Sequence, residues 1–259
     1  MRRSTIPLVI TLAATVGLTA CEKKDKPITE VDPASIAAAQ EMKVDKDFGD
    51  KVRAYILQHP EILLEAQQAL QLKAMAEEEA VIERQFASHK VQLQRDKRDF
   101  VINPQGKVTV VQLFDYNCTY CKVIAPEVAK LARENPNVRF VFKDYTLGNF
   151  GPTSEYAAAA ARALGNKGLF ADAHFEMMNH RPLTDEQVDD LLARNGIAPA
   201  SVRALEQTPE QVQYLADQRQ LAKDMGINGT PAFFVEGDFI SGAQTEALKA
   251  AIAKALSGK

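Results

Sequence analysis

Two cysteines, Cys118 and Cys121, lie two residues apart directly after an apolar, β-branched run, Val108–Phe114. Residues 122–135 continue with a helical pattern, so the spacing predicts one sulfur at a helix N-terminus and the other one turn further in. Free backbone N–H groups and the helix dipole stabilise a thiolate at that end and lower the pKa of the thiol. Because a thiolate is both a nucleophile and a leaving group, this pair indicates thiol–disulfide exchange.

A pair of cysteines at this spacing can also be half of a zinc site, which needs four ligands. The chain has one further cysteine, Cys21, and no second pair. The histidines are scattered and share no ligand spacing with the cysteines: they are His59, His89, His174 and His180. We interpret His174 and His180 as surface or helix-capping residues. We therefore predict no metal site and no cofactor.

The N-terminus has the pattern of a targeting segment. Two arginines precede an apolar run at residues 6–20, which is shorter than the roughly 20 residues that a membrane span needs. The run ends in Leu-Thr-Ala before Cys21 and resembles the bacterial lipoprotein cleavage box. The resemblance predicts a signal peptide at 1–20, a lipid on Cys21 and a periplasmic, membrane-anchored protein. An ordinary secretory signal with a chance cysteine is the alternative, and Glu22 slightly favours the outer membrane.

Composition excludes some partners and restricts the use of the cysteines. The formal net charge of −3 argues against binding to nucleic acid. With Cys21 modified, Cys118 and Cys121 are left to pair with each other, which suits an oxidising envelope compartment. A disulfide across so short a loop would restrain little of the unfolded chain, so a structural role is disfavoured.

The segment before the cysteine pair is predicted to be helical. Residues 21–33 are polar and form a predicted tether, and residues 34–99 have no strand pattern. Positions at spacings of three and four, with two polar interruptions, form a heptad-like seam: Leu72, Met75, Glu79, Ile82, Phe86, His89 and Leu93. A segment with apolar stripes and little core of its own is predicted to self-associate. Packing of these helices on the next domain is the alternative.

A second domain is predicted over residues 100–259. Val108–Phe114 and residues 138–143 read as strands around one helix, which implies parallel pairing through a right-handed crossover. An alanine-rich helical insert is predicted at about 150–225. A strand at 232–235, a short strand at 239–241 and a helix at 244–256 are predicted to close the chain.

Three motifs resemble one family. The stretch Cys121–Pro126 is similar to the residues after the active-site pair of thioredoxin-fold proteins, and Phe114–Asn117 resembles the entry to that pair in the DsbA family. Thr230–Phe233 resembles the family's cis-proline loop. The resemblance implies an α/β protein with a thioredoxin fold and an inserted helical subdomain, preceded by an all-α N-terminal arm.

In the arm, Tyr55–Leu57 and Pro60–Ala66 resemble the N-terminal region of ScsC-type proteins, which self-associate and act as disulfide isomerases. The resemblance implies that Cys118 is the exposed nucleophile and that Cys121 is the resolving thiol. It also implies that Thr119–Tyr120 tunes the pKa of the nucleophile, and that Thr230–Pro231 docks the substrate backbone. The chain departs from the family pattern in its Thr-Tyr dipeptide, where ScsC-type proteins usually have Pro-Tyr, and in its lipoprotein box.

The sequence therefore predicts an envelope protein-disulfide isomerase that forms homo-oligomers. Its partners would be unfolded or misoxidised envelope proteins and a membrane redox partner, either a reductase or a quinone-linked oxidase. A dithiol oxidase that donates disulfides is the first alternative. A non-enzymatic lipoprotein that binds a soft metal through the Cys118–Cys121 dithiol is the alternative of another class.

Overall fold

A computed structural model describes residues 38–258 of the chain. The predicted signal peptide, the tether and Cys21 lie outside the described residues. The chain divides into two compact units between Leu63 and Leu64. Within the described part, no helix is long and apolar enough to cross a membrane, and no three His, Cys, Asp or Glu side chains are placed to hold a metal ion.

The helices and strands follow one another in this order: α2 (Lys46–Gln58), α3 (Glu61–Arg95), β1 (Phe100–Ile102), β2 (Val108–Phe114), α4 (Thr119–Glu134), β3 (Val138–Asp144), α5 (Thr153–Gly165), α6 (Phe170–Asn179), α7 (Asp185–Arg194), α8 (Pro199–Glu206), α9 (Pro209–Asp224), β4 (Ala232–Val235), β5 (Asp238–Ser241) and α10 (Thr245–Ser257). Local residues set several of these boundaries. The Asp45 carboxylate accepts from the backbone N–H of Phe48 at the start of α2. Pro199 and Pro209 occupy the first position of α8 and α9, where a missing N–H costs nothing.

Five strands form one sheet in the order β1-β3-β2-β4-β5. Strands β2 and β3 run parallel, with Val108 opposite Val138 and Phe114 opposite Asp144, as the strand–helix–strand pattern predicts. The pairs β1·β3, β2·β4 and β4·β5 are antiparallel. Strand β1 was not predicted, because three residues are too few for a period-two pattern to be recognised.

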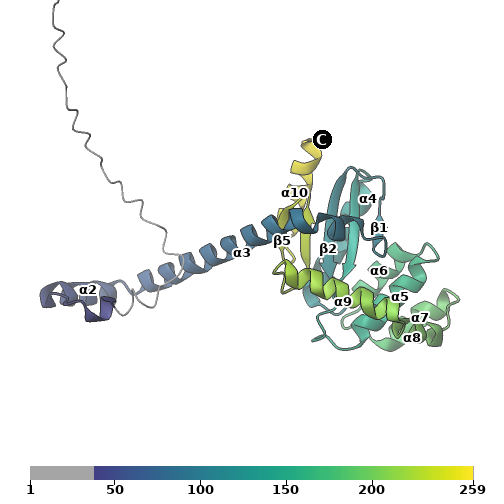
Figure 1. Cartoon of the computed structure of the whole chain (residues 1–259), viewed down its shortest axis with the longest axis horizontal. Helices are drawn as coiled ribbons and strands as arrows, with labels where there is room; N and C mark the ends of the chain where they lie inside the picture. Colours follow the sequence, from purple (N-terminus) through teal and green to yellow (C-terminus); the bar gives the residue numbers. More distant parts are fainter. Residues whose placement is uncertain (1–37, 259) are drawn as a thin grey trace, which may run out of the picture. The chain divides into compact units, whose positions relative to one another are not determined.

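Helices cover both faces of the sheet. Along β2, Val110 and Phe114 point into a large core shared with α4, α10 and the helices between β3 and β4. Val111 and Leu113 point into a smaller core on the opposite face, shared with α3 and the end of α9. Strand alternation therefore assigns the apolar side chains of β2 to one of two cores. Figure 1 shows α5, α6, α7 and α8 gathered at one end of the sheet, where the sequence predicts the helical insert.

The predicted heptad seam lies along α3, and its two halves differ in burial. Ile82, Phe86 and Leu93 are buried against the sheet, whereas Leu72 and Met75 are 68% and 55% exposed. The ring of Phe86 stacks on that of Phe234 in β4, with centroids 5.5 Å apart. The second domain is predicted to begin at residue 100, but the second half of α3, which precedes that residue, packs on the sheet. Sequence spacing identified the stripe but not which part of it has a partner.

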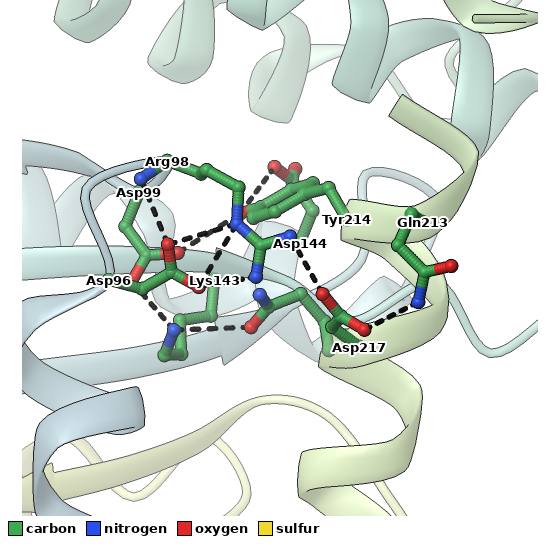
Figure 2. A network of polar contacts seen from close by, with 9 residues as sticks. Asp96, Arg98, Asp99, Lys143, Asp144, Gln213, Tyr214 and Asp217 are labelled. Carbon is green, nitrogen blue, oxygen red and sulfur yellow. Dashed lines mark hydrogen bonds and ion pairs between the residues drawn. The ribbon is translucent and has the colours of Figure 1, made fainter. Parts of the chain in front are cut away.

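The charged residues that follow α3 are part of a polar network that Figure 2 shows from close by. Lys143 Nζ lies 2.6 Å from Asp99 Oδ2, and both side chains are almost completely buried. The Tyr214 hydroxyl on α9 lies within hydrogen-bond distance of carboxylate oxygens of Asp99 and Asp144, at 3.2 and 3.4 Å. Burial raises the pKa of Asp99 to about 6 and that of Asp144 to about 7. The network ties the segment after α3 to β3 and α9.

His174 lies in the core, so its interpretation as a surface residue was wrong. The side chain is 1% exposed and its Nδ1 lies 3.1 Å from the Tyr116 hydroxyl. Rings of Phe114, Phe142 and Phe170 pack around it within 5.3 Å between centroids. Burial lowers the pKa of His174 to about 3, so the imidazole is neutral at physiological pH. These aromatic neighbours come from three elements, which explains why local sequence did not indicate a buried site.

Candidate active site

Cys118 is positioned by the turn between β2 and α4. It is the N-cap residue of α4, with extended backbone angles, and its carbonyl accepts from the N–H of Lys122 at 3.2 Å. Its own N–H donates to the Asp115 carbonyl, which closes the turn after the strand. The sulfur therefore lies at the N-terminal end of a 16-residue helix, as the spacing of the cysteines predicts.

The two thiols have opposite pKa shifts. The pKa of Cys118 is lowered to about 6, first by a hydrogen bond with the Cys121 thiol and then by Thr230 and the backbone N–H groups of Cys121 and Tyr120. Burial raises the pKa of Cys121 well above its usual value. Cys118 is therefore mostly thiolate at pH 7, while Cys121 keeps its proton. This is the arrangement that an attacking and a resolving sulfur require.

The Thr230–Pro231 peptide bond is cis, as the family resemblance implies. The Cys118 sulfur lies 3.2 Å from the Thr230 carbonyl oxygen, so the loop and the helix end meet at the sulfur. A thiol donates to that carbonyl, but a thiolate cannot. The Thr230 hydroxyl oxygen is buried and has no hydrogen-bond partner among the described residues, so it is the group available to donate to the thiolate.

The structure corrects the predicted exposure of the nucleophile. Cys118 is 3% exposed, because its sulfur is turned inward toward Cys121 and Thr230. Thr119 and Tyr120 in the first turn of α4 are exposed, Tyr120 to 66%. The role of these two side chains in tuning the pKa of Cys118 stays a prediction. The backbone N–H of Tyr120 does contribute to the low pKa of Cys118.

Buried polar residues hold the turn before Cys118 in place. The Asp115 carboxylate accepts from the N–H of Asn117 at 2.7 Å, the Ser154 hydroxyl at 2.6 Å and the N–H of Leu147 at 3.2 Å. The Asn117 side chain forms two hydrogen bonds with the backbone of Leu183, one with its N–H and one with its carbonyl. The helical insert therefore supports the site directly, through partners that are far apart in sequence.

Two basic residues beside the cysteines were not predicted as site residues. Lys122 is 3% exposed, and its Nζ lies 3.4 Å from the Met177 carbonyl. Burial lowers the pKa of Lys122 to about 8, against the opposing effects of Asp115 and Cys121. Arg181, which precedes a second cis proline, donates to the Lys122 carbonyl at 3.0 Å. A lysine directly after the second cysteine was a visible signal, but nothing local placed Arg181 nearby.

Comparison with known proteins agrees with this geometry. Residues 109–253 match the family described as DSBA-like thioredoxin domain, and residues 46–77 match the copper resistance protein ScsC N-terminal domain. ScsC of Proteus mirabilis in a transitional conformation is 27% identical, with a TM-score of 0.60 over 86% of this chain and 99% of that one. BcfH of Salmonella enterica Typhimurium is 25% identical, with a TM-score of 0.66 over 86% and 98%. A thioredoxin-like oxidoreductase of Silicibacter pomeroyi is 32% identical, with a TM-score of 0.59 over 65% and 98%.

Among curated proteins, the chain resembles part of a larger protein. It is 34% identical over 172 residues to Na(+)/H(+) antiporter NhaA 1 of Salinispora arenicola, a match to 62% of this chain. The chain spans about a quarter of the length of the curated relatives it matches. Because the DSBA-like match covers more than half of its residues, the chain belongs to the DSBA-like thioredoxin domain family, with an ScsC-type N-terminal segment ahead of that domain.

Proposed function

We propose that this protein is an envelope protein-disulfide isomerase that exchanges disulfides through Cys118 and Cys121. The observation that supports thiol–disulfide exchange is the pair of opposite pKa shifts, one thiol lowered to about 6 at a helix N-terminus and the other raised by burial. The adjacent Thr230–Pro231 loop supports it, because its backbone can pair with an extended substrate.

The proposed reaction begins at the Cys118 thiolate. It attacks one sulfur of a substrate disulfide, so that a Cys118–substrate disulfide forms and the other substrate sulfur leaves as a thiolate. In isomerisation, another substrate thiolate attacks the mixed disulfide, which forms a new substrate disulfide and regenerates Cys118. In the escape step, Cys121 loses its proton and attacks Cys118, so the substrate leaves reduced and the Cys118–Cys121 pair is oxidised.

The N-terminal segment supports isomerisation over simple oxidation. In the described part of the chain, many exposed large apolar residues lie between residues 42 and 75. Helix α2, which is part of this stretch, buries none of its residues. A surface of this kind is typical of an interaction site. The match of residues 46–77 to the ScsC N-terminal domain supports the same role. We propose that this segment joins copies of the chain and so presents several sites to one misoxidised substrate.

Aspartate in place of Leu63 and Leu70 should test this role of the segment. The two exposed leucines lie seven residues apart on α3, so they share a helical face and their substitution removes no buried contact. We expect the double variant to become monomeric, as measured by light scattering. Its refolding of scrambled ribonuclease should fall several-fold, while its reduction of insulin should be unchanged.

The matched control for this test is Val212→Asp, a similarly exposed apolar position on α9. The control should keep the mass and the isomerase activity of the original chain. An original chain that is already monomeric, or a monomeric double variant with undiminished isomerase activity, would contradict the proposed role of the segment.

A dithiol oxidase is the second candidate, and the low pKa of Cys118 favours it. A stabilised thiolate makes the reduced form more stable, so the disulfide becomes a stronger oxidant. The redox state of the pair inside cells separates the two candidates, since an isomerase is kept reduced and an oxidase is kept oxidised. In both cases we propose a periplasmic location, a lipid on Cys21 and recharging by a membrane redox partner.

A further inference from the structure

A small groove lies beside the cis-proline loop. It is lined by Met75 and Ile82 of α3 and by Phe239 of β5. Residues 226–229, directly before Thr230, also line it. Its volume of about 90 Å³ is far below the roughly 300 Å³ at which sites for small-molecule ligands begin. The groove is therefore the size of a single side chain, not of a cofactor.

The groove lies next to the cis-proline loop along the chain, because Gly229 lines it and Thr230 follows directly. The Cys118 sulfur lies 3.2 Å from the Thr230 carbonyl, so a substrate cysteine bonded to Cys118 lies beside that residue. An extended substrate that pairs with the loop backbone runs past Gly229 and Asn228, both of which line the groove. In an extended chain each residue advances about 3.3 Å, so the side chain that meets the groove belongs to a residue close to the substrate cysteine.

Charge decides which side chain suits the groove. Glu78 and Glu79 of α3 line it, and neither has an ion-pair or hydrogen-bond partner within residues 38–258. Glu83, one turn further along α3, accepts from the N–H of Phe239 and fixes the helix beside β5. A lysine or arginine side chain fits both the apolar lining and the two glutamates, since its aliphatic stem covers apolar surface while its cation remains near the rim.

We propose that this groove receives a lysine or arginine side chain of an extended substrate segment, close to the substrate's reacting cysteine. The inference rests on the proposed thiol–disulfide exchange and adds a substrate preference to it. Helix α3 would then contribute to recognition as well as to the core, and substrates with basic residues near their cysteines would react faster.

The test uses the full chain with Cys121→Ser, so that the reaction stops at the mixed disulfide. Ten-residue peptides have one cysteine linked to 5-thio-2-nitrobenzoate. The Cys118 thiolate attacks the peptide sulfur, the Cys118–peptide disulfide forms, and 5-thio-2-nitrobenzoate leaves as a coloured thiolate. Lysine, glutamine or glutamate is placed in turn at each of the four positions on either side of the cysteine.

We expect lysine at one or two adjacent positions to raise the second-order rate constant about fivefold over glutamine, with glutamate lowering it. The double substitution Glu78→Gln and Glu79→Gln should remove this preference, and high salt should reduce it. Glu77→Gln is the matched control, because Glu77 is an exposed neighbour on the same helix and does not line the groove. The control should keep the preference.

Three outcomes would overturn the inference. Equal rates for all peptides would mean that the groove does not select the side chain. An equal loss of the lysine preference with Glu77→Gln would mean that the preference comes from the overall negative charge of α3 and not from the groove. A lysine effect that falls as protein concentration rises would indicate a second copy of the chain in the groove. If no peptide reacts faster than with Cys118→Ser in place, the exchange function fails and this inference fails with it.

Discussion

Serine in place of Cys118 should reduce thiol–disulfide exchange to its uncatalysed rate. The hydroxyl of serine is not ionised near pH 7 and cannot form a mixed disulfide, so the first step of the reaction is lost. Reduction of insulin and refolding of scrambled ribonuclease measure the effect. Cys121→Ser should behave differently: the attack by Cys118 remains, and mixed disulfides with substrate should accumulate on non-reducing gels.

This pair of variants also separates the redox function from soft-metal binding. A protein that only binds metal through the dithiol should be affected about equally by either substitution, because each removes one ligand. An unequal effect, with trapped substrate in Cys121→Ser alone, is expected from the assigned roles. Exchange activity that survives Cys118→Ser would contradict them.

Methionine in place of Lys143 should have the largest effect on stability. Lys143 is the cation that contacts the buried Asp99 carboxylate, at 2.6 Å (Figure 2). Its loss leaves that carboxylate buried and uncompensated, which should lower the free energy of unfolding at pH 8 by about 3–5 kcal/mol. Urea unfolding measures the change. Lys223→Met at an exposed position of α9 is the control and should change it by less than about 0.5 kcal/mol.

Asparagine in place of Asp144 should raise the free energy of unfolding at pH 8, the opposite of the effect of Lys143→Met. Burial raises the pKa of Asp144 from 3.8 to about 7, so the folded state binds more protons than the unfolded state between these values. Stability therefore falls as pH rises from about 4 to about 7, and the penalty is complete above that range. Asp144→Asn removes this penalty and should stabilise the protein by about 1–2 kcal/mol at pH 8. The gain is smaller than the full penalty because the N–H groups of the new amide lack a partner.

The pH dependence distinguishes these two effects from simple packing changes. The difference in free energy of unfolding between Asp144→Asn and the original chain should disappear as pH falls toward 4, where Asp144 is protonated in both the folded and the unfolded state. The loss in Lys143→Met should also shrink at pH 5, because Asp99 then takes up a proton. Differences that stay constant across pH 4–8 would contradict the electrostatic explanation.

Much of the site could be predicted from sequence because its signals are local. The cysteine pair, the helix after it and the strand before it are neighbours along the chain, and each has its own periodicity. The Thr230–Pro231 loop lies far from the cysteines in sequence, and only the family resemblance placed it beside them. The cis peptide bond and the contact with Cys118 followed from that placement.

The features that sequence did not predict depend on contacts between distant segments. His174 is enclosed by rings from β2 and β3 as well as from its own helix, and Lys143 of β3 contacts Asp99, which lies 44 residues earlier in the chain. The seam along α3 predicts an apolar stripe, but an identical pattern is exposed up to Met75 and packs in the core from Ile82 onward. Burial is decided by which partner covers a side chain, and periodicity contains no information on the partner.

The most direct test of this account is the pH dependence of Cys118 alkylation by iodoacetamide in the reduced chain. Peptide mass mapping assigns the modified sulfur, so both cysteines remain in place and their hydrogen bond is kept. The account predicts that the rate at Cys118 rises with a midpoint near pH 6, while Cys121 stays unreactive to well above pH 9. One shared midpoint near pH 9, or faster modification of Cys121, would contradict it.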